Sequence, residues 1–496
     1  MKLLLFAISF ALSCYCGGQE LKVYFGNLHS HTSYSDGSGT PEEAYKYARD
    51  MAKIDFLAIT EHNHPAAPSR IAAEPELYSG TVSTSLISTA KRFNVDGHFV
   101  AIYGQEFSSI GTGNHANILE INKVIQPAEV PNGRWDKLMN DFLPTLTDAQ
   151  GRLPLMLLNH PSISSSPNNL EYGRDDYADF NEWISKLDSY AQLINMINGP
   201  SHQMNQPAGS PSESEFLRYL NMGLHVAPTA DQDNHLKNWG NAANPRTAVI
   251  TTSLTKANIL NALRARNVYA TEDKNLSVIA KINNRLIGSI FAGAEVPAVN
   301  SNLAIEINIE DADEPNAHYT IDVYADSIGG QRMADVVKQV QFTGNGTFQI
   351  NDVKYKGGNQ YFFLKITQTD EDAVLVDRAW LAPVWFEPNA ATPASTPIVL
   401  TLEVNKVTEE AKISNVGNTD VNLKNWTLVS TVGNQTFKFT ANRVVKPGEF
   451  VIVTSGPNAV NNGNKVLWTT QYIWSNSGDP GQLLNPQGQI IAATQD

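Results

Sequence analysis

The sequence predicts an α/β domain built on parallel strands, followed by two smaller domains made of strands alone. Between residues 19 and 290, short apolar runs alternate with longer segments of helical character, which is typical of a parallel sheet. From about residue 295 the apolar residues recur with a period of two, which is typical of antiparallel strands. The chain has 496 residues, of which 42% are hydrophobic and 17% charged, so it can form several packed cores.

The first 18 residues are expected to be an export signal. A lysine at the second position precedes an apolar stretch, residues 3–12, that is too short to span a bilayer as a helix. Cleavage before Gln19 would remove Cys14 and Cys16, the only two cysteines of the chain. Alternatively, the four residues that end at Cys14 form an imperfect lipobox, and Cys14 carries lipid. We therefore expect an exported protein, periplasmic or secreted, with no membrane span.

Eight apolar runs are the expected strands of the first domain, residues 19–290. They are residues 23–28, 56–60, 100–103, 118–121, 155–158, 193–197, 224–228 and 248–251. Helical segments lie between them, and the one at 40–51 starts with a Thr-Pro-Glu-Glu sequence that favours a helix N-terminus. Another helix is expected at 259–266. This alternation predicts a parallel sheet, either open or closed into a barrel.

Two all-β domains are expected after the first. Residues 291–386 show period-two alternation punctuated by glycine turns, which predicts a small β-sandwich. Residues 387–397 are rich in Pro, Ala and Thr and are expected to be a linker. Residues 398–496 again indicate short strands, separated by turns rich in Gly, Asn and Pro.

Polar clusters that contain histidine or carboxylate residues follow or open the expected strands. Residues two apart on a strand point to the same face, and the ends of the strands of a parallel barrel meet on one side of it. Six histidines and three carboxylates should therefore converge, and we interpret them as a metal site. The nine residues are His29, His31, Asp36, His62, Glu106, His115, His160, Asp233 and His235.

The sequence leaves open the roles of other polar residues near these motifs. His64 is a ligand, a substrate contact or an exposed residue. Asp231 either orients a ligand or caps a helix, and Glu61 is expected to orient a ligand. An isolated histidine is more often a hydrogen-bonded core residue than a ligand. That interpretation applies to His98, His202, His225 and His318.

The order of the motifs resembles the PHP (polymerase and histidinol phosphatase) family of metal-dependent phosphoesterases. The motifs are H-x-H with a later D-G, T-E-H, G-x-E, a single histidine, N-H-P and D-x-H, and they cover residues 22–290. The resemblance implies a distorted (β/α)7 barrel of seven parallel strands that holds two or three divalent ions. It assigns His29, His31, Glu106 and Asp233 to one ion, Glu106, His115 and His160 to a second, and Asp36, His62 and His235 to a third.

The chemistry of the ligands supports the same expectation. Mixed imidazole and carboxylate ligands suit Zn²⁺, Mn²⁺ or Fe²⁺ better than Ca²⁺. The net charge of −14 argues against broad binding to nucleic acid, but bound cations reverse the sign of the field locally. We therefore expect a metal-dependent phosphomonoesterase or phosphodiesterase in which a metal-bridging hydroxide attacks phosphorus. Its substrate would be a small-molecule or polymeric phosphoester.

Four further residues are candidates for catalysis. Arg174 and Arg246 could each grip a phosphate through two parallel hydrogen bonds. Alternatively, Arg174 lies on the surface and Arg246 pairs with an acid. His64 and His202 are candidates for the general acid that protonates the leaving group.

Residues 398–496 resemble a lamin-tail domain, an immunoglobulin-like β-sandwich. The resemblance is carried by residues 413–417, 423–428, 446–452 and 475–479. No catalytic cluster is present in these sequences, so we expect this domain to contact a cell surface or a polymer.

Two other functions stay open on the sequence alone. The same barrel could hydrolyse an amide, ester or carbamate, because an activated water attacks a carbonyl carbon as well as phosphorus. The chain could also be a non-catalytic surface-binding protein whose metal cluster is structural. Structural metal sites are normally small and saturated, whereas this one would have nine ligands from several strand ends.

Overall fold

The computed structural model describes residues 20–63, 69–80, 82–108, 115–126, 128–147, 152–161, 171–204, 206–329, 334–370, 376–389, 400–416, 420–446, 448–486 and 490–494. The expected export signal, Cys14 and His64 lie outside the described residues. Within these ranges, no helix is both long enough and apolar enough to cross a membrane.

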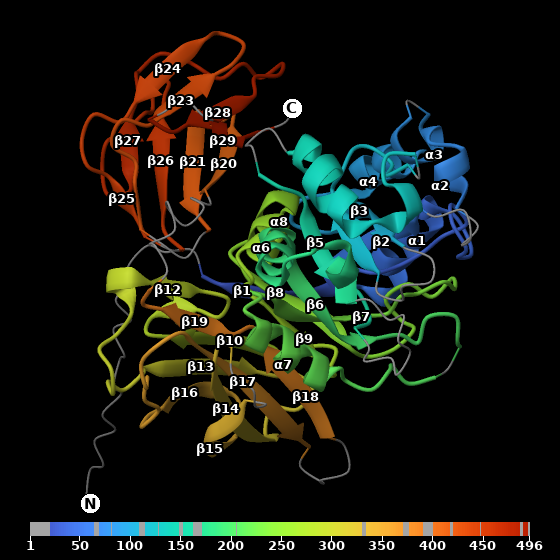
Figure 1. Ribbon diagram of the computed structural model, residues 1–496. Helices are drawn as coiled ribbons and strands as arrows, with labels where there is room; N and C mark the ends of the chain where they lie inside the picture. The colour runs from blue at the N-terminus through green and yellow to red at the C-terminus, as the bar shows by residue number, and fades with distance from the viewer. Residues whose placement is uncertain are drawn as a thin grey trace, which may run out of the picture.

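The first part of the chain contains strands β1–β9 and the helices that connect them (Figure 1). The strands are β1 (Lys22–Asn27), β2 (Phe56–His62), β3 (Val100–Phe107), β4 (Ala116–Leu119), β5 (Leu155–Leu158), β6 (Ala191–Asn198), β7 (Ala227–Asp231), β8 (Arg246–Thr251) and β9 (Val268–Thr271). The α-helices are α1 (Pro41–Tyr47), α2 (Arg70–Ala73), α3 (Glu76–Ser79), α4 (Leu86–Phe93), α5 (Trp135–Lys137), α6 (Phe180–Tyr190), α7 (Glu213–Met222) and α8 (Lys256–Arg264). Each of the eight expected strands overlaps one of β1–β8.

Strands β1–β7 lie side by side in chain order in one sheet. Strands β1, β2 and β3 pair in parallel, as do β5, β6 and β7, but β4 is antiparallel to both of its neighbours. The expectation of seven parallel strands is therefore wrong at β4. Residues 108–115, which join β3 to β4, are too few for the crossover that a parallel strand needs. The described chain is also mostly sheet, and its α-helices are short.

The two ends of the β1–β7 sheet meet at its carboxyl edge. Ser30, which follows β1, forms a parallel bridge with Asn234, which follows β7. The His31 N–H donates to the Asn234 carbonyl at 2.8 Å. On β8, the Thr247 hydroxyl accepts from the Ala230 N–H at 3.0 Å. The sheet therefore curves until the segments after β1 and β7 are neighbours.

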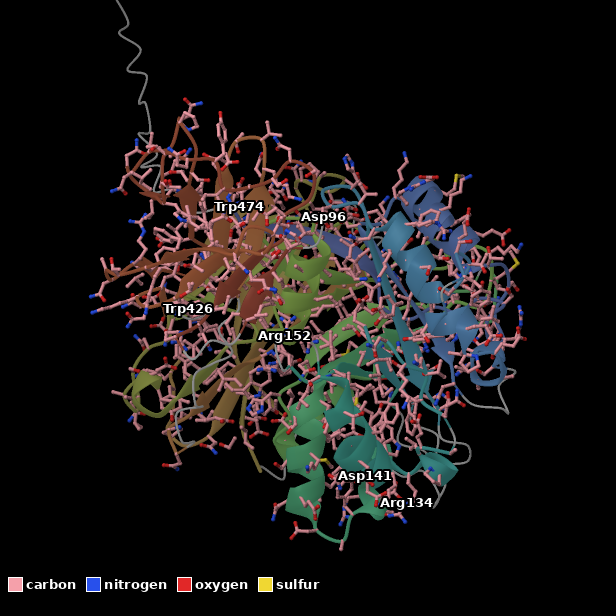
Figure 2. The ribbon with its side chains drawn as sticks, turned by 90° about the horizontal axis from the view of Figure 1, so that it is seen from above. Asp96, Arg134, Asp141, Arg152, Trp426 and Trp474 are labelled. Carbon is pink, nitrogen blue, oxygen red and sulfur yellow. The ribbon has the colours of Figure 1, made fainter. Side chains whose placement is uncertain are left out.

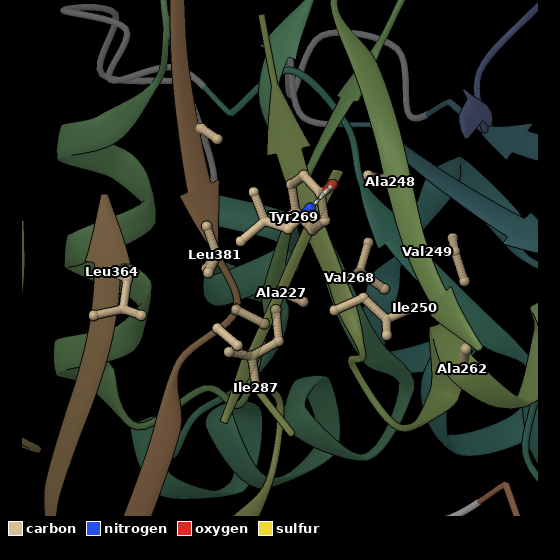
Figure 3. Close-up of a cluster of buried hydrophobic side chains, with 14 of the residues drawn as sticks. Ala227, Ala248, Val249, Ile250, Ala262, Val268, Tyr269, Ile287, Leu364 and Leu381 are labelled. Atoms are coloured by element: carbon tan, nitrogen blue, oxygen red, sulfur yellow. Dashed lines mark hydrogen bonds between the residues drawn. The ribbon is translucent and has the colours of Figure 1, made fainter. Parts of the chain in front are cut away.

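One face of this curved sheet packs into a single apolar core. Leu28, Phe56, Val100, Leu155 and Leu193, from five different strand regions, are all buried in it. Figure 3 shows the part of the core that surrounds β8 and β9. Because side chains alternate along a strand, the other face needs a separate cover.

Short helices cover part of that other face. Tyr45 of α1 and Ala90 of α4 are buried against Leu57 of β2 and Ala101 of β3. Helix α1 starts at the expected place: Thr40 caps it, and the Thr40 side chain and Glu43 bond reciprocally to each other's backbone N–H.

The next part of the chain forms two sheets. Its strands are β10 (Ser277–Ile282), β11 (Arg285–Leu286), β12 (Ile290–Ala292), β13 (Ile305–Glu310), β14 (His318–Ser327), β15 (Asp335–Thr343), β16 (Gly346–Ile350), β17 (Gln360–Thr369), β18 (Val376–Leu381) and β19 (Val384–Glu387). Strands β11, β10, β13 and β16 make one sheet. The others join the β1–β9 sheet, because β18 pairs with β9. The boundary expected at residue 290 lies inside this module, since β10 pairs with β13.

The C-terminal strands form a lobe of their own, coloured orange to red in Figure 1. They are β20 (Leu400–Asn405), β21 (Glu410–Asn415), β22 (Val421–Asn422), β23 (Thr427–Ser430), β24 (Gln435–Lys438), β25 (Val444–Val445), β26 (Phe450–Thr454), β27 (Lys465–Leu467), β28 (Gly481–Leu484) and β29 (Ile490–Ala493). Two four-stranded sheets enclose a core that includes Trp426 and Trp474, both labelled in Figure 2. The expected all-β domain is confirmed.

Candidate metal centre

The structure brings the nine predicted ligands together at the carboxyl edge of β1–β7. Eight of them form groups whose ligand atoms lie within 4.8 Å of one another, and His160 joins them through Glu106. His115 precedes its strand, whereas the other ligands lie at or after the ends of theirs. Because β4 runs antiparallel, its first residue lies at the same edge as the last residues of the other strands.

The first group consists of His29, His31, Glu106 and Asp233, and its four ligand atoms have nearly equal spacing. The Nε2 atom of His29 lies 3.2 Å from each of His31 Nε2, Glu106 Oε2 and Asp233 Oδ1. His31 Nε2 lies 3.3 Å from Glu106 Oε2 and 3.2 Å from Asp233 Oδ1. A cation bound tetrahedrally with bonds of 2.0–2.1 Å separates its ligands by about 3.3–3.4 Å. These four atoms therefore fit a divalent ion.

The two carboxylate oxygens of Glu106 face different sets of imidazoles. Its Oε2 belongs to the group just described, whereas its Oε1 lies 3.1 Å from His115 Nδ1 and 3.2 Å from His160 Nε2. The side chain of Glu106 is only 1% exposed, so water cannot solvate both oxygens. A buried carboxylate with a nitrogen set on each oxygen has the arrangement of a ligand that bridges two cations.

The third group surrounds Asp36. His235 Nε2 lies 3.2 Å from Asp36 Oδ1, and His62 Nε2 lies 3.6 Å from Asp36 Oδ2. His31 joins this group as well, which the sequence did not predict. Asp36 Oδ1 and His235 Nε2 are both buried without a hydrogen bond to any described residue. A cation between them would compensate both atoms, so the residues fit a metal here too.

The electrostatics of the cluster favour ionised carboxylates. Burial raises the pKa of Glu106, but the surrounding histidines lower it by more, to well below its usual value. For Asp36 and Asp233, burial likewise raises the pKa and the neighbouring histidines lower it by more, so both pKa values are lowered. Burial lowers the pKa of His62 to about 3. Cations bind ionised carboxylates and neutral imidazoles, which are the forms these four residues adopt.

The pKa of His31 is shifted in the opposite direction from that of His62. Burial by itself would lower its pKa, but its hydrogen bonds to Asp233 and Glu106 raise it well above the usual value. A cation at the first group would therefore have to displace a proton from His31.

Glu61 holds the loop that carries Asp36. Its carboxylate accepts hydrogen bonds from the Thr32 N–H at 3.1 Å, from the Thr32 hydroxyl and from the Ser35 hydroxyl. Glu61 is fully buried, and burial raises its pKa. Glu61 is therefore bonded to the segment between His31 and Asp36, and its role in orienting a ligand stays a prediction.

Within the described ranges, Asp231 forms no hydrogen bond with the nine predicted ligands and caps no helix. Its Oδ1 accepts from the Leu28 N–H at 2.6 Å and from the Thr247 hydroxyl at 3.1 Å. Its Oδ2 accepts from the Asn195 side chain at 2.8 Å. The carboxylate therefore joins the segment after β1 to the middle of β6 and to the start of β8.

Three asparagines, whose roles the sequence did not indicate, form hydrogen bonds with predicted ligands. Asn159 Nδ2 donates to Glu106 Oε1 at 2.9 Å, and Asn198 Nδ2 donates to Asp233 Oδ2 at 3.1 Å. Asn195 Oδ1 accepts from the His160 N–H at 3.1 Å. Each asparagine lies at the end of an apolar strand or within it. The strand pattern predicts that these positions are buried. A polar residue at a buried position is the signal that could have identified them.

Two ligands adopt backbone angles that side chains rarely take. His160 has φ of 28° and Asp233 has φ of 50°. Such conformations cost about 1–3 kcal/mol each and persist where the surroundings impose them. At both positions the strained backbone directs a ligand into the cluster.

The candidate catalytic residues have different surroundings. His202 stacks on His235, with ring centroids 3.6 Å apart, so it lies at the rim of the cluster. Arg246 is buried, and its Nη1 donates to the carbonyls of Ala243, Asn244 and Pro245 at 2.7–2.9 Å. Its Nη1 is therefore held by the backbone, it forms no ion pair among the described residues, and its predicted role as a phosphate clamp is not supported.

Arg174 also forms no described contact with the nine ligands. Its Nη1 donates to the Tyr177 carbonyl at 3.0 Å, and its guanidinium lies 5.6 Å from the centre of the Phe180 ring. Among the histidines interpreted as core residues, His225 is half-buried and hydrogen-bonded between Asp188 and Glu387. His98 and His318 are instead exposed.

Comparisons with known proteins identify the C-terminal lobe. Residues 395–495 match the sequence model of the Lamin Tail Domain family, which confirms the predicted resemblance of that part of the chain. An uncharacterised protein of Chlamydia muridarum (strain MoPn / Nigg) is 21% identical over 396 residues, which cover 74% of this chain. The chain spans 57% of the length of that relative. The family match does not extend to residues 22–290, so the resemblance to the PHP family stays a prediction.

Solved structures add only weak likenesses. The soluble domain of PmoD from Methylocystis sp. ATCC 49242 (Rockwell) has 9% identity and a TM-score of 0.16, and covers 22% of this chain and 91% of its own. The periplasmic chaperone SfaE has 12% identity and a TM-score of 0.17, and covers 44% of this chain and 98% of its own. The alpha-2-macroglobulin of E. coli has 9% identity and a TM-score of 0.16, over 50% of this chain and 16% of its own. TM-scores this low carry no argument.

Proposed function

We propose that residues 20–290 are a PHP-type metal-dependent phosphoesterase. In this proposal the nine clustered residues hold two or three divalent ions, either Zn²⁺, Mn²⁺ or Fe²⁺. The observation that carries the proposal is the position of Glu106, whose two buried oxygens each face a separate set of imidazoles. A purely structural metal site would not need a carboxylate shared between two sets of ligands.

The bound ions would supply Lewis-acid stabilisation of a phosphoryl group and lower the pKa of water. The chain's own residues would fix the ions and leave one side open to the substrate. His29 and His31 are fully buried, whereas His115 and His160 are each 26% exposed. The substrate would therefore approach from the side of β4 and β5. His202, at the rim on His235, would contact the leaving group.

Metal content and turnover together test this proposal. The mature protein should contain at least two equivalents of Zn, Mn or Fe by elemental analysis. A phosphomonoester or phosphodiester should be hydrolysed, and chelation should abolish this turnover until a divalent ion is restored. Turnover that persists after complete removal of metal would contradict the mechanism.

Two variants and one substrate pair complete the test. His29→Ala should lose metal and at least about 100-fold in kcat/KM, more than the loss typical of residues that only orient ligands. His98→Ala is the matched control, because His98 is exposed and outside the cluster. Comparison of p-nitrophenyl phosphate with a matching aryl ester separates phosphoester hydrolysis from the alternative carbonyl hydrolysis. Preferential turnover of the ester would favour the alternative.

A further inference from the structure

A second group of acidic residues lies in the module that follows the first domain. One carboxylate oxygen from each of Asp273, Glu314 and Asp377 lies within 4.8 Å of the others. Two oxygen ligands on opposite sides of a Ca²⁺ ion are separated by about 4.6–5.2 Å. None of these residues belongs to the cluster at the carboxyl edge of β1–β7.

The register of the sheet explains why these side chains meet. Tyr319 on β14 pairs with Gln368 on β17, which in turn pairs with Asp377 on β18. Strand β18 also pairs with β9, and Asp273 lies two residues after the end of β9. The four residues therefore form a row across neighbouring strands, and the segment after β13, which carries Glu314, lies over it.

Gln368 is an independent sign of a ligand in this row. It is only 1% exposed, and its Nε2 donates to Asp311 Oδ2 at 2.7 Å and to Glu314 Oε2 at 2.9 Å, so its amide points into the acidic group. The Oε1 atom of the same amide is buried and has no hydrogen-bond partner in the described part of the chain. A buried acceptor without a donor is costly, and a cation would compensate it.

Tyr319 gives the same indication from the other side of the row. Its side chain is 1% exposed, and its hydroxyl has no partner among the described residues. Its pairing with Gln368 places the ring in the same row, and burial together with the nearby carboxylates of Asp311, Glu314 and Asp273 raises its pKa.

The basic residues near this group also have partners outside it. Lys274 lies 3.2 Å from Asp313, and Arg378 lies 2.5 Å from Glu272, so both already have carboxylate partners. The guanidinium of Arg246 is held by backbone carbonyls. Like charges on neighbouring strands destabilise a sheet, which makes a bound cation the expected compensation.

We propose that Asp273, Glu314, Asp377 and the Gln368 carbonyl oxygen bind a Ca²⁺ ion. All four ligands are oxygens, which Ca²⁺ prefers, whereas the histidine-rich cluster offers nitrogen as well. The ion would join β9, β17 and β18 to the segment after β13. It would act on the stability of the β-module and is independent of the hydrolytic function proposed above.

The test uses the full chain with its histidine-rich cluster loaded with zinc. Addition of CaCl₂ should raise the Tm of the module by about 3 °C or more, because Ca²⁺ binds the folded state. Tb³⁺, which replaces Ca²⁺, should bind with luminescence sensitised by the adjacent Tyr319 ring, and Ca²⁺ should displace it. Asp377→Asn should lose both responses, whereas Asp313→Asn, which changes an exposed carboxylate nearby, should keep them.

Stability in chelator separates loss of the ion from damage to the fold. With Ca²⁺ removed, Asp377→Asn should be at least as stable as the wild type, because it relieves repulsion among the carboxylates. Glu314→Gln, on a segment outside the strands, gives a second variant with the same expected losses. Ca²⁺ and Tb³⁺ responses that are equal in the wild type and both variants would overturn the proposal. Absence of any response up to about 10 mM Ca²⁺, well above the weakest extracellular sites, would overturn it as well.

Discussion

Single buried side chains fix the segments that carry the ligands. Glu61 binds the loop before Asp36 through three hydrogen-bond donors, and Asn159 binds Glu106 directly. In the proposed metal centre, neighbours of this kind would set the orientation of a ligand before any metal binds, so their loss should weaken metal binding without removing a ligand.

Glu61→Gln should lower the affinity for the ion at the Asp36 group by about 10–100-fold. The amide keeps the shape of the side chain but cannot accept from all three donors on the loop. Metal titration with elemental analysis would show one ion lost first while the ions bound through Glu106 remain. Equal weakening of all ions would assign Glu61 a general structural role instead.

His202→Ala should reduce kcat by about 10²-fold or more for a substrate with a poor leaving group, such as an alkyl phosphate. The effect on p-nitrophenyl phosphate should be much smaller, because that leaving group needs no proton. Steady-state kinetics on both substrates distinguish a contact with the leaving group from loss of packing on His235. A uniform loss on both substrates would indicate the latter.

At the scale of elements, the direction of β4 decides which residues reach the centre. The N-H-P and D-x-H motifs follow strands, but His115 precedes one, and only the antiparallel course of β4 brings it to the same edge. The motifs and their order were readable from the sequence. The reversal of β4 was not predicted, although the short segment before it was visible.

A second element-scale contact joins the first domain to the β-module. His225 Nδ1 lies 2.9 Å from Asp188 Oδ2, and His225 Nε2 lies 2.8 Å from Glu387 Oε1 on β19. Burial by itself would lower the pKa of His225, but the two carboxylates raise it to about 9. An unfolded histidine has a pKa of about 6.5, so the stabilisation is fully present below pH 6.5 and is lost as the pH rises through 9.

Glu387→Gln should therefore destabilise the protein by about 1–3 kcal/mol at pH 6 and by less at pH 10. Urea unfolding of the wild type and the variant at several pH values measures this difference. A difference that stays constant from pH 6 to pH 10 would show that the charge on His225 does not contribute.

At the scale of the whole molecule, the C-terminal lobe has a core of its own. Its buried residues all lie beyond residue 399, and none of them belongs to the cores of the preceding parts. The lobe should therefore unfold separately from the domain that carries the metal centre.

Trp426→Ala should destabilise only the C-terminal lobe, by about 3–5 kcal/mol, because it removes a large buried side chain. Calorimetry should show one transition shifted to lower temperature and the other unchanged. Hydrolysis of a small phosphoester, the activity proposed for the first domain, should be unaffected. A loss of activity that parallels the loss of stability would show that the two parts depend on each other.

The sequence by itself determined the strand runs, the all-β C-terminal domain and the set of nine ligand candidates, because these depend on local periodicity and on motifs of adjacent residues. It could not determine that β18 pairs with β9, that Arg246 is held by the backbone, or that Asp273, Glu314, Gln368 and Asp377 meet. Those facts depend on strand register and on chain direction. Contacts between residues far apart in the sequence are set by the packing of the whole fold, and only the tertiary structure decides them.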